Sequence, residues 1–187
     1  MAQYVGRSNM LAQGIADSRE VRQQPYWAQL DVNGTADLRF FTAVPATAVA
    51  GNMQVAGQFP APKQALIYGI SAYLPPDTPL ADAVEIMGNA AGTTGRVIVF
   101  RIADKEYLRV PIWLASQAGG LFTTGAPVAV SSVSNGWPSA ANFYHIKPAL
   151  LVPKQQNFEV LLINNSALTG AVFLTLLLHV TEERAVQ

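Results

Sequence analysis

The last third of the chain contains three runs in which nearly every position is apolar, at residues 146–152, 158–163 and 171–180. A strand in an isolated two-sheet sandwich has one face in the core and one in water, so its residues should alternate between apolar and polar. In the third run, up to Leu178, only Thr175 is polar. The pattern therefore predicts three strands with two buried faces. A chain of this size has little left to cover the second face, so we expect neighbouring copies to cover it.

Alternation with a period of two begins upstream at residue 26 and indicates a strand over residues 26–32. A second strand follows over residues 38–44. The intervening Asn33-Gly34 pair suits both positive-φ positions of a type I′ turn, which is the strongest short signal for a β-hairpin. The sequence therefore predicts that these two strands pair with each other.

Further elements follow along the chain. Residues 64–74 form a strand that ends at a pair of prolines, and residues 79–87 form a short helix. Residues 96–103 and 106–114 flank a tight turn at residues 104–105 and predict a second hairpin.

The elements together predict an all-β protein, an antiparallel β-sandwich built as a single jelly roll of about eight strands with one short helix. We divide the chain into an N-terminal arm (residues 1–25) and a jelly-roll domain (residues 26–187). The arm is polar, with a thin apolar stripe that includes Leu11 and Ile15. Two interpretations of it stay open: a loosely ordered terminus, or an arm that docks on a neighbouring subunit or a membrane surface.

The composition favours a protein whose surface is largely buried in contacts with other subunits. Of the 187 residues half are hydrophobic and only 13% are charged, which is about half the usual charged share of a soluble domain. Twelve basic and twelve acidic residues cancel. Because nucleic-acid-binding proteins normally carry a basic excess, we expect no direct contact with nucleic acid. The N-terminal residues lack the apolar stretch of a signal peptide, so we do not expect secretion by that route.

Motifs for catalysis or for cofactor and metal binding are missing. There is no cysteine, and neither His145 nor His179 has a second ligand at metal-binding spacing. The sequence around Ser71 lacks the second glycine of a nucleophile elbow, and the glycines of residues 88–95 are not followed by the lysine of a phosphate-binding loop. We therefore expect no enzymatic activity, no cofactor and no metal.

Two long segments without regular structure, residues 45–62 and 115–142, exceed the length usual for loops in compact domains. Both are moderately apolar, so we expect them to pack against neighbouring subunits together with the arm. The candidate interface residues are Leu11, Ile15, Met53, Phe59, Phe122 and Trp137.

The succession of strand 146–152, the turn Pro153-Lys154-Gln155-Gln156-Asn157, strand 158–163 and a closing strand to His179 resembles a known family. It is similar to the single jelly-roll major capsid proteins of icosahedral viruses, and in particular to the small capsid subunit of tailless bacteriophages with an internal membrane. The resemblance covers about residues 26–181.

The resemblance implies a structural protein of the virion that associates with itself, and it allows a second capsid protein and contact with an internal membrane. The chain departs from RNA-binding capsid proteins because it lacks a basic arm. A membrane between shell and genome would remove the need for such an arm.

An alternative is a lectin-like or spike β-sandwich that binds glycans on a host surface. Aromatic planes stack on sugar rings, and Trp27 and Trp137 are candidates for that role. Trp113 lies between Ile112 and Leu114 and is expected in the core.

Overall fold

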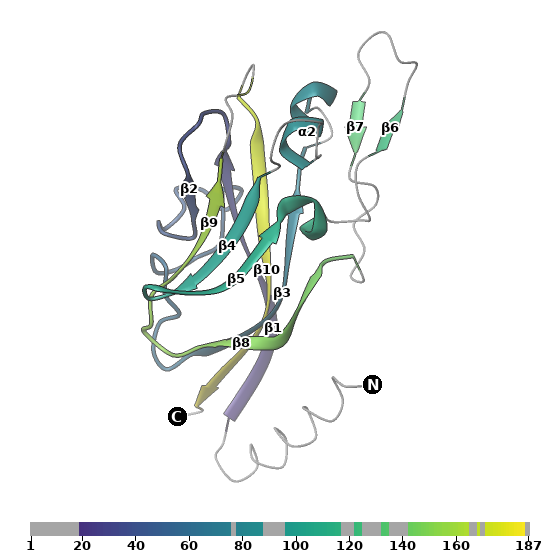
Figure 1. Ribbon diagram of the computed structural model, residues 1–187. Helices are drawn as coiled ribbons and strands as arrows, with labels where there is room; N and C mark the ends of the chain where they lie inside the picture. The colour runs from purple at the N-terminus through teal and green to yellow at the C-terminus, as the bar shows by residue number, and fades with distance from the viewer. Residues whose placement is uncertain are drawn as a thin grey trace.

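The computed structural model describes residues 19–75, 78–87, 96–116, 122–124, 132–134, 142–164, 168 and 171–185. Within these ranges two four-stranded antiparallel sheets pack face to face, and β6 and β7 form a separate two-stranded sheet (Figure 1). The elements are β1 Arg19–Asp31, β2 Leu38–Phe40, β3 Gln64–Tyr73, α2 Leu80–Met87, β4 Val97–Ile102, β5 Lys105–Pro111, the 3-10 helix η1 Ile112–Ala115, β6 Phe122–Thr124, β7 Ser132–Ser134, β8 Tyr144–Val152, β9 Phe158–Ile163 and β10 Phe173–Ala185.

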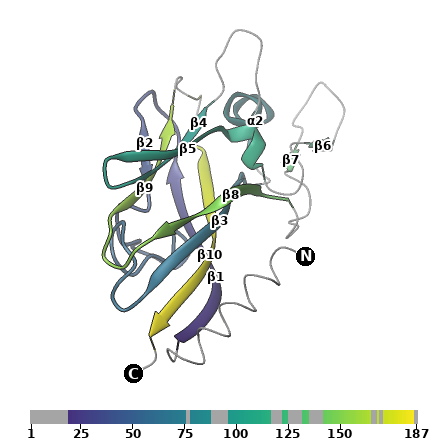
Figure 2. The ribbon, with the colours of Figure 1, turned by 60° about the horizontal axis from the view of Figure 1, so that its bottom comes forward.

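The strand order is that of a jelly roll. Sheet A has the order β1-β10-β3-β8, and Figure 2 shows these strands side by side; sheet B has the order β2-β9-β4-β5. The antiparallel pairs β1–β10, β2–β9, β3–β8 and β4–β5 are nested in the sequence, as in one long hairpin that has been rolled up. The β10–β3 and β4–β9 pairings then join the nested pairs into two sheets. This arrangement confirms the predicted fold class.

The two predicted hairpins have different outcomes. The second hairpin is confirmed, since β4 and β5 pair antiparallel, and its turn lies at Ala103-Asp104, one residue earlier than predicted. The one at Asn33-Gly34 is wrong, because β1 pairs with β10 and β2 pairs with β9 in the other sheet. The Asn33 side-chain oxygen accepts a hydrogen bond from the backbone N–H of Leu168 (3.2 Å), far away in the sequence. Asn33 and Gly34 therefore lie where the chain crosses from sheet A to sheet B.

Sheet A starts earlier in the chain than expected. β1 begins at Arg19, and residues 19–25, which were assigned to the arm, pair with the C-terminal half of β10. Pro25 lies opposite His179 and Arg19 lies opposite Ala185. The boundary between arm and domain is corrected accordingly, and Leu11 and Ile15 lie outside the described residues.

The core between the sheets is rich in aromatic rings. Phe158 stacks on Phe59 with ring centroids 5.1 Å apart and on Phe100 at 5.8 Å, while Tyr26 meets Phe59 edge to face at 5.1 Å. Met53 and Phe59 are 4% and 0% exposed. The expectation that these two loop side chains face neighbouring subunits is therefore wrong. They fill the core of their own sandwich.

One end of the sandwich is held by a buried polar side chain. Asn164, directly after β9, donates from its side-chain amide to the carbonyl of Val32 (3.1 Å) and to that of Gly34. Its side-chain oxygen accepts from the Nε–H of Arg96, which is buried next to β4. Its backbone N–H donates to Asp37 (3.1 Å). Asn164 thus ties the crossing between the sheets to the segment that precedes β4.

Candidate assembly surface

The outer face of sheet B is covered by its own charged side chains. Leu161 of β9 and Val99 of β4 lie opposite each other on this face, yet they are only 6% and 0% exposed. Arg39 lies opposite Leu161 in β2, and Arg109 lies opposite Val99 in β5. Long arginine side chains cover apolar neighbours with their methylene stems while the charged ends stay in water. The stems thus cover this apolar pair.

Ion pairs hold these arginines over the sheet. Glu159 accepts from Arg39 at 3.0 Å and lies 3.5 Å from Arg101, and Glu106 pairs with Arg109 at 2.8 Å. The hydrogen bonds from Arg109 lower the pKa of the Glu106 carboxyl, which keeps the pair ionised. The expectation that β9 needs a neighbouring copy on its second face is therefore wrong, because its own sheet covers that face.

The outer face of sheet A has the opposite character. Along β10 the even-numbered residues from Leu174 to Glu182 are buried, and the odd-numbered residues point outward. Large apolar and aromatic side chains gather on the outward side of β1, β10, β3 and β8. We call this set the sheet A patch: Trp27, Leu66, Tyr68, Tyr73, Phe143, Leu151, Phe173, Leu177 and the two histidines, His145 and His179.

The sheet A patch is partly open to solvent and nearly uncharged. Phe173 is 48% exposed and Leu151 is 53% exposed. Among the described residues of β1, β10 and β3, the outer face carries no charged side chain between Asp31 at one end and Glu183 at the other. Exposed apolar groups gathered in one area mark contact sites more often than isolated ones do. The second face of β8 and β10 is thus the one that remains available to a partner.

Both histidines lie within this patch. His179, Gly69 and His145 occupy one row across β10, β3 and β8. Gly69 has no side chain, and the ring of Phe143 fills the space above it, where a Cβ atom would come within 2.2 Å of the ring. The Phe143 ring centroid lies 4.1 Å from that of His179 and 4.1 Å from that of His145.

The environment of His179 favours its neutral form. The hydroxyl of Ser71, which is fully buried, lies 3.1 Å from His179 Nε2, and Tyr68 packs at 6.1 Å. Burial, followed by the charge of His145, lowers the pKa of His179, and burial raises the pKa of Tyr68. The strand register brings the two histidines together around an aromatic ring and not around a metal. Among the described residues no group of three or more potential ligands could hold one.

The long loop after β2 covers the free edge of β1. The backbone N–H of Gln29 donates to Ala50 (2.8 Å), and that of Asn52 donates to the carbonyl of Trp27 (3.3 Å). Beside this contact lies an open groove with a volume of about 240 Å³, lined in part by Trp27, Phe41 and Met53. The backbone of this loop thus covers the edge of β1, and its Met53 and Phe59 fill the core of its own subunit, whereas Val49 is 77% exposed.

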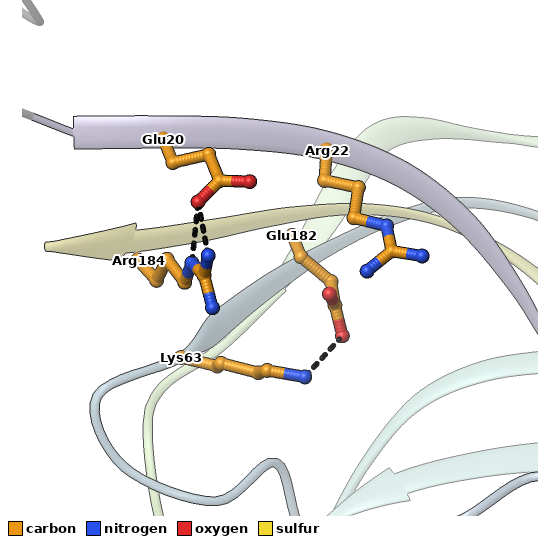
Figure 3. A pocket seen from close by; sticks show the side chains of 5 residues that line it. All are labelled: Glu20, Arg22, Lys63, Glu182 and Arg184. Atoms are coloured by element: carbon orange, nitrogen blue, oxygen red, sulfur yellow. Dashed lines mark hydrogen bonds and ion pairs between the residues drawn. The ribbon is translucent and has the colours of Figure 1, made fainter. Parts of the chain in front are cut away.

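A charged cluster lies where the ends of β1 and β10 extend beyond the core (Figure 3). Glu20 pairs with Arg184, and Lys63 lies 3.6 Å from Glu182. The Tyr26 hydroxyl donates to Glu182, and burial together with this bond raises the pKa of Tyr26. The space between these groups is about 20 Å³, enough for one water molecule. The cluster therefore secures the strand ends and offers no ligand site.

The remaining predicted residues are placed as follows. Phe122 begins β6, and its side chain lies outside the described residues, as does the whole of Trp137. Trp113 is 49% exposed in η1, so its predicted place in the core is wrong. The strand expected to run to residue 114 ends at Pro111, where η1 begins.

No protein-family model matches the sequence, and no curated protein matches it. In the part of the chain that the structure describes, no helix is long and apolar enough to cross a membrane.

Proposed function

We propose that the protein is a structural subunit that associates with copies of itself through the sheet A patch and builds a virion shell. The observation that carries this proposal is the difference between the two outer faces. On sheet B the apolar pair Leu161 and Val99 is buried beside the sheet's own arginines, whereas sheet A leaves Phe173 and Leu151 about half exposed. A low overall charge is in keeping with a surface that is largely buried in contacts.

The uncharged character of the patch argues for a second copy as its partner. On β1, β10 and β3 the patch carries no charge, so two copies meet there without like-charge repulsion, and a charged partner would find little that is complementary; among the described residues, Lys147 of β8 is the one charged neighbour. Four strands about 4.8 Å apart with a rise of about 3.3 Å per residue present roughly 600 Å² per subunit, taking the ten residues of β3 as the length. Two such faces bury an area at the lower end of the specific range. The contact is then modest, and because a patch that pairs with its own copy closes a dimer, a shell needs further contacts between such dimers.

The shell is the part of the proposal supported by the jelly-roll topology and by the resemblance to capsid subunits. Jelly rolls also occur in lectins, so the fold alone does not separate the two roles. A glycan-binding role is the second candidate, and the position of Trp27 beside the open groove favours it. In either case we propose a binding or structural role without catalysis.

The test compares two aromatic residues of similar exposure on the two sheets. Phe173 is 48% exposed in sheet A, and Tyr107 is 46% exposed in sheet B. We expect the full chain to form oligomers or particles in light scattering and electron microscopy. Phe173→Lys and Leu151→Lys should leave folded monomers, while Tyr107→Lys should assemble like the parent protein.

A chain that stays monomeric at high concentration, or lysine variants that assemble normally, would overturn the proposal. Glycan-array binding that is lost in Trp27→Ala would support the glycan-binding role instead.

A further inference from the structure

Three packed rings form part of the sheet A patch: the Phe143 ring is nearly parallel to that of His179, at 19°, and is tilted by 39° from that of His145. A centroid separation of 4.1 Å is a face contact, since edge-to-face pairs lie about 5 Å or more apart. Two rings cannot occupy the same face of Phe143 at that distance, so His179 and His145 lie on its opposite faces. The register agrees with this order, because Gly69 of β3 separates the two histidines by two strand spacings. The order of the stack is therefore His179, Phe143, His145.

The charge of this stack depends on pH. Imidazole is the side chain that ordinarily gains a proton between pH 8 and 5. When neutral, the three rings continue the uncharged patch. When protonated, the two imidazoles place like charges on either side of one ring, on a face that association would remove from water.

The groups packed around His179 do not compensate such charge. Pro25 of β1 and Gly69 of β3 flank it in the row, and Ser71 of β3 offers a hydroxyl that can donate to the neutral ring or accept from the charged one. Tyr68 is a neutral phenol near the stack. Charged groups on these strands lie further along them. On β8, Lys147 follows His145 by two residues and adds positive charge. On β10, Glu183 follows His179 by four residues, and its carboxylate accepts a hydrogen bond from Gln64 at 2.5 Å.

We propose that the His179–Phe143–His145 stack makes association through the sheet A patch sensitive to pH, so that acidification releases the subunits. The inference rests on the proposed function. A histidine whose pKa is lowered by burial takes up its proton more readily when it is exposed again, so dissociation is coupled to proton uptake. Burial within the single subunit already lowers the pKa of His179, and further burial in the assembly would lower it more. Association is then strongest above the pKa of His179 in the free subunit, which burial holds below the ordinary value of about 6.5, and it weakens as the pH falls below that pKa.

The experiment measures the dissociation constant of the full chain by sedimentation or light scattering at pH 8 and pH 5.5. We expect it to rise about tenfold or more on acidification, since each pKa unit of further lowering in the assembly corresponds to a factor of ten. The double variant His145→Gln/His179→Gln changes the patch itself, so its own dissociation constant at pH 8 is the reference, and relative to that value it should lose the pH dependence. Lys147→Gln removes a neighbouring charge and should keep the pH dependence.

Three results would count against the inference in distinguishable ways. A protein that assembles at pH 8 and is unchanged at pH 5.5 overturns the inference alone. If the double variant keeps the full pH dependence, other groups cause that dependence, and the inference is also overturned. A chain that is monomeric at both pH values overturns the proposed function and the inference with it. Circular dichroism at pH 5.5 verifies that the released subunits remain folded.

Discussion

The effects of Gly69 and Phe143 on stability should be strongly coupled: Gly69→Ala should lower the unfolding free energy of the parent protein but not that of the Phe143→Ala variant. In Gly69→Ala the new methyl carbon would lie 2.2 Å from Cδ2 and 2.3 Å from Cε2 of Phe143. Carbon atoms in contact normally lie about 3.5–4.0 Å apart, so the ring must leave its place. Complete burial of a phenylalanine side chain contributes about 1.5–3 kcal/mol, and Phe143 is only partly buried. We therefore expect Gly69→Ala to cost about 1–2 kcal/mol of unfolding free energy.

The same substitution should be harmless once the ring is gone. Phe143→Ala alone loses a similar amount, but it leaves the space above Gly69 empty. The next contact, the carbonyl oxygen of Tyr144 at 3.3 Å, requires only a small adjustment. Alanine in a strand is favoured over glycine by about 0.5–1 kcal/mol, because the unfolded chain loses less conformational freedom. Gly69→Ala should therefore be neutral or stabilising in the Phe143→Ala background.

Urea unfolding of the four proteins in this cycle measures the coupling, which we expect to be about 2 kcal/mol. Far-UV circular dichroism follows the unfolding. An equal cost of Gly69→Ala in both backgrounds would show that Phe143 does not occupy the space above Gly69. That result would also remove the stack on which the pH inference depends.

Two further substitutions test the ends of the sandwich. Asn164→Ala should lower the unfolding free energy by about 2–4 kcal/mol, because it removes the three hydrogen bonds of this side chain, including the one from Arg96. Asn157 is exposed, and Asn157→Ala is the control. A similar loss of unfolding free energy for both variants in urea would contradict the role of Asn164. Tyr26→Phe should cost about 1–2 kcal/mol at pH 7, because it removes the bond to the Glu182 carboxylate. Because the folded state raises the pKa of Tyr26, its contribution is present below the ordinary tyrosine value of about 10 and is lost as the pH rises above it. The difference in melting temperature between Tyr26→Phe and the parent should therefore shrink above pH 10, and a constant difference would refute the argument.

Local signals in the sequence predicted local structure well. The β4–β5 hairpin depends on a turn between adjacent strands, and the sequence there contains all the necessary information. Asn33-Gly34 has equally good turn chemistry, but its partners are distant residues such as Leu168. A contact of that kind depends on the packing of both sheets, so inspection of the neighbouring residues could not find it.

The cover of β9 and the histidine stack were missed for a related reason. Leu161 is covered by Arg39 across the sheet, and the sequence does not state which strand lies beside which. His145 and His179 meet only because β3 separates their strands. Gly69 was the available signal, since an isolated glycine within a strand often marks the close approach of another group.

The place of β10 in sheet A affects when the subunit becomes able to bind. β10 lies between β1 and β3 and is the last strand of the described chain, so a ribosome must deliver it before β1 gains a neighbour in the sheet. Until then Trp27 and Leu177 belong to separate stretches of polypeptide. The surface that we propose for association is thus complete only after β10 has been synthesised.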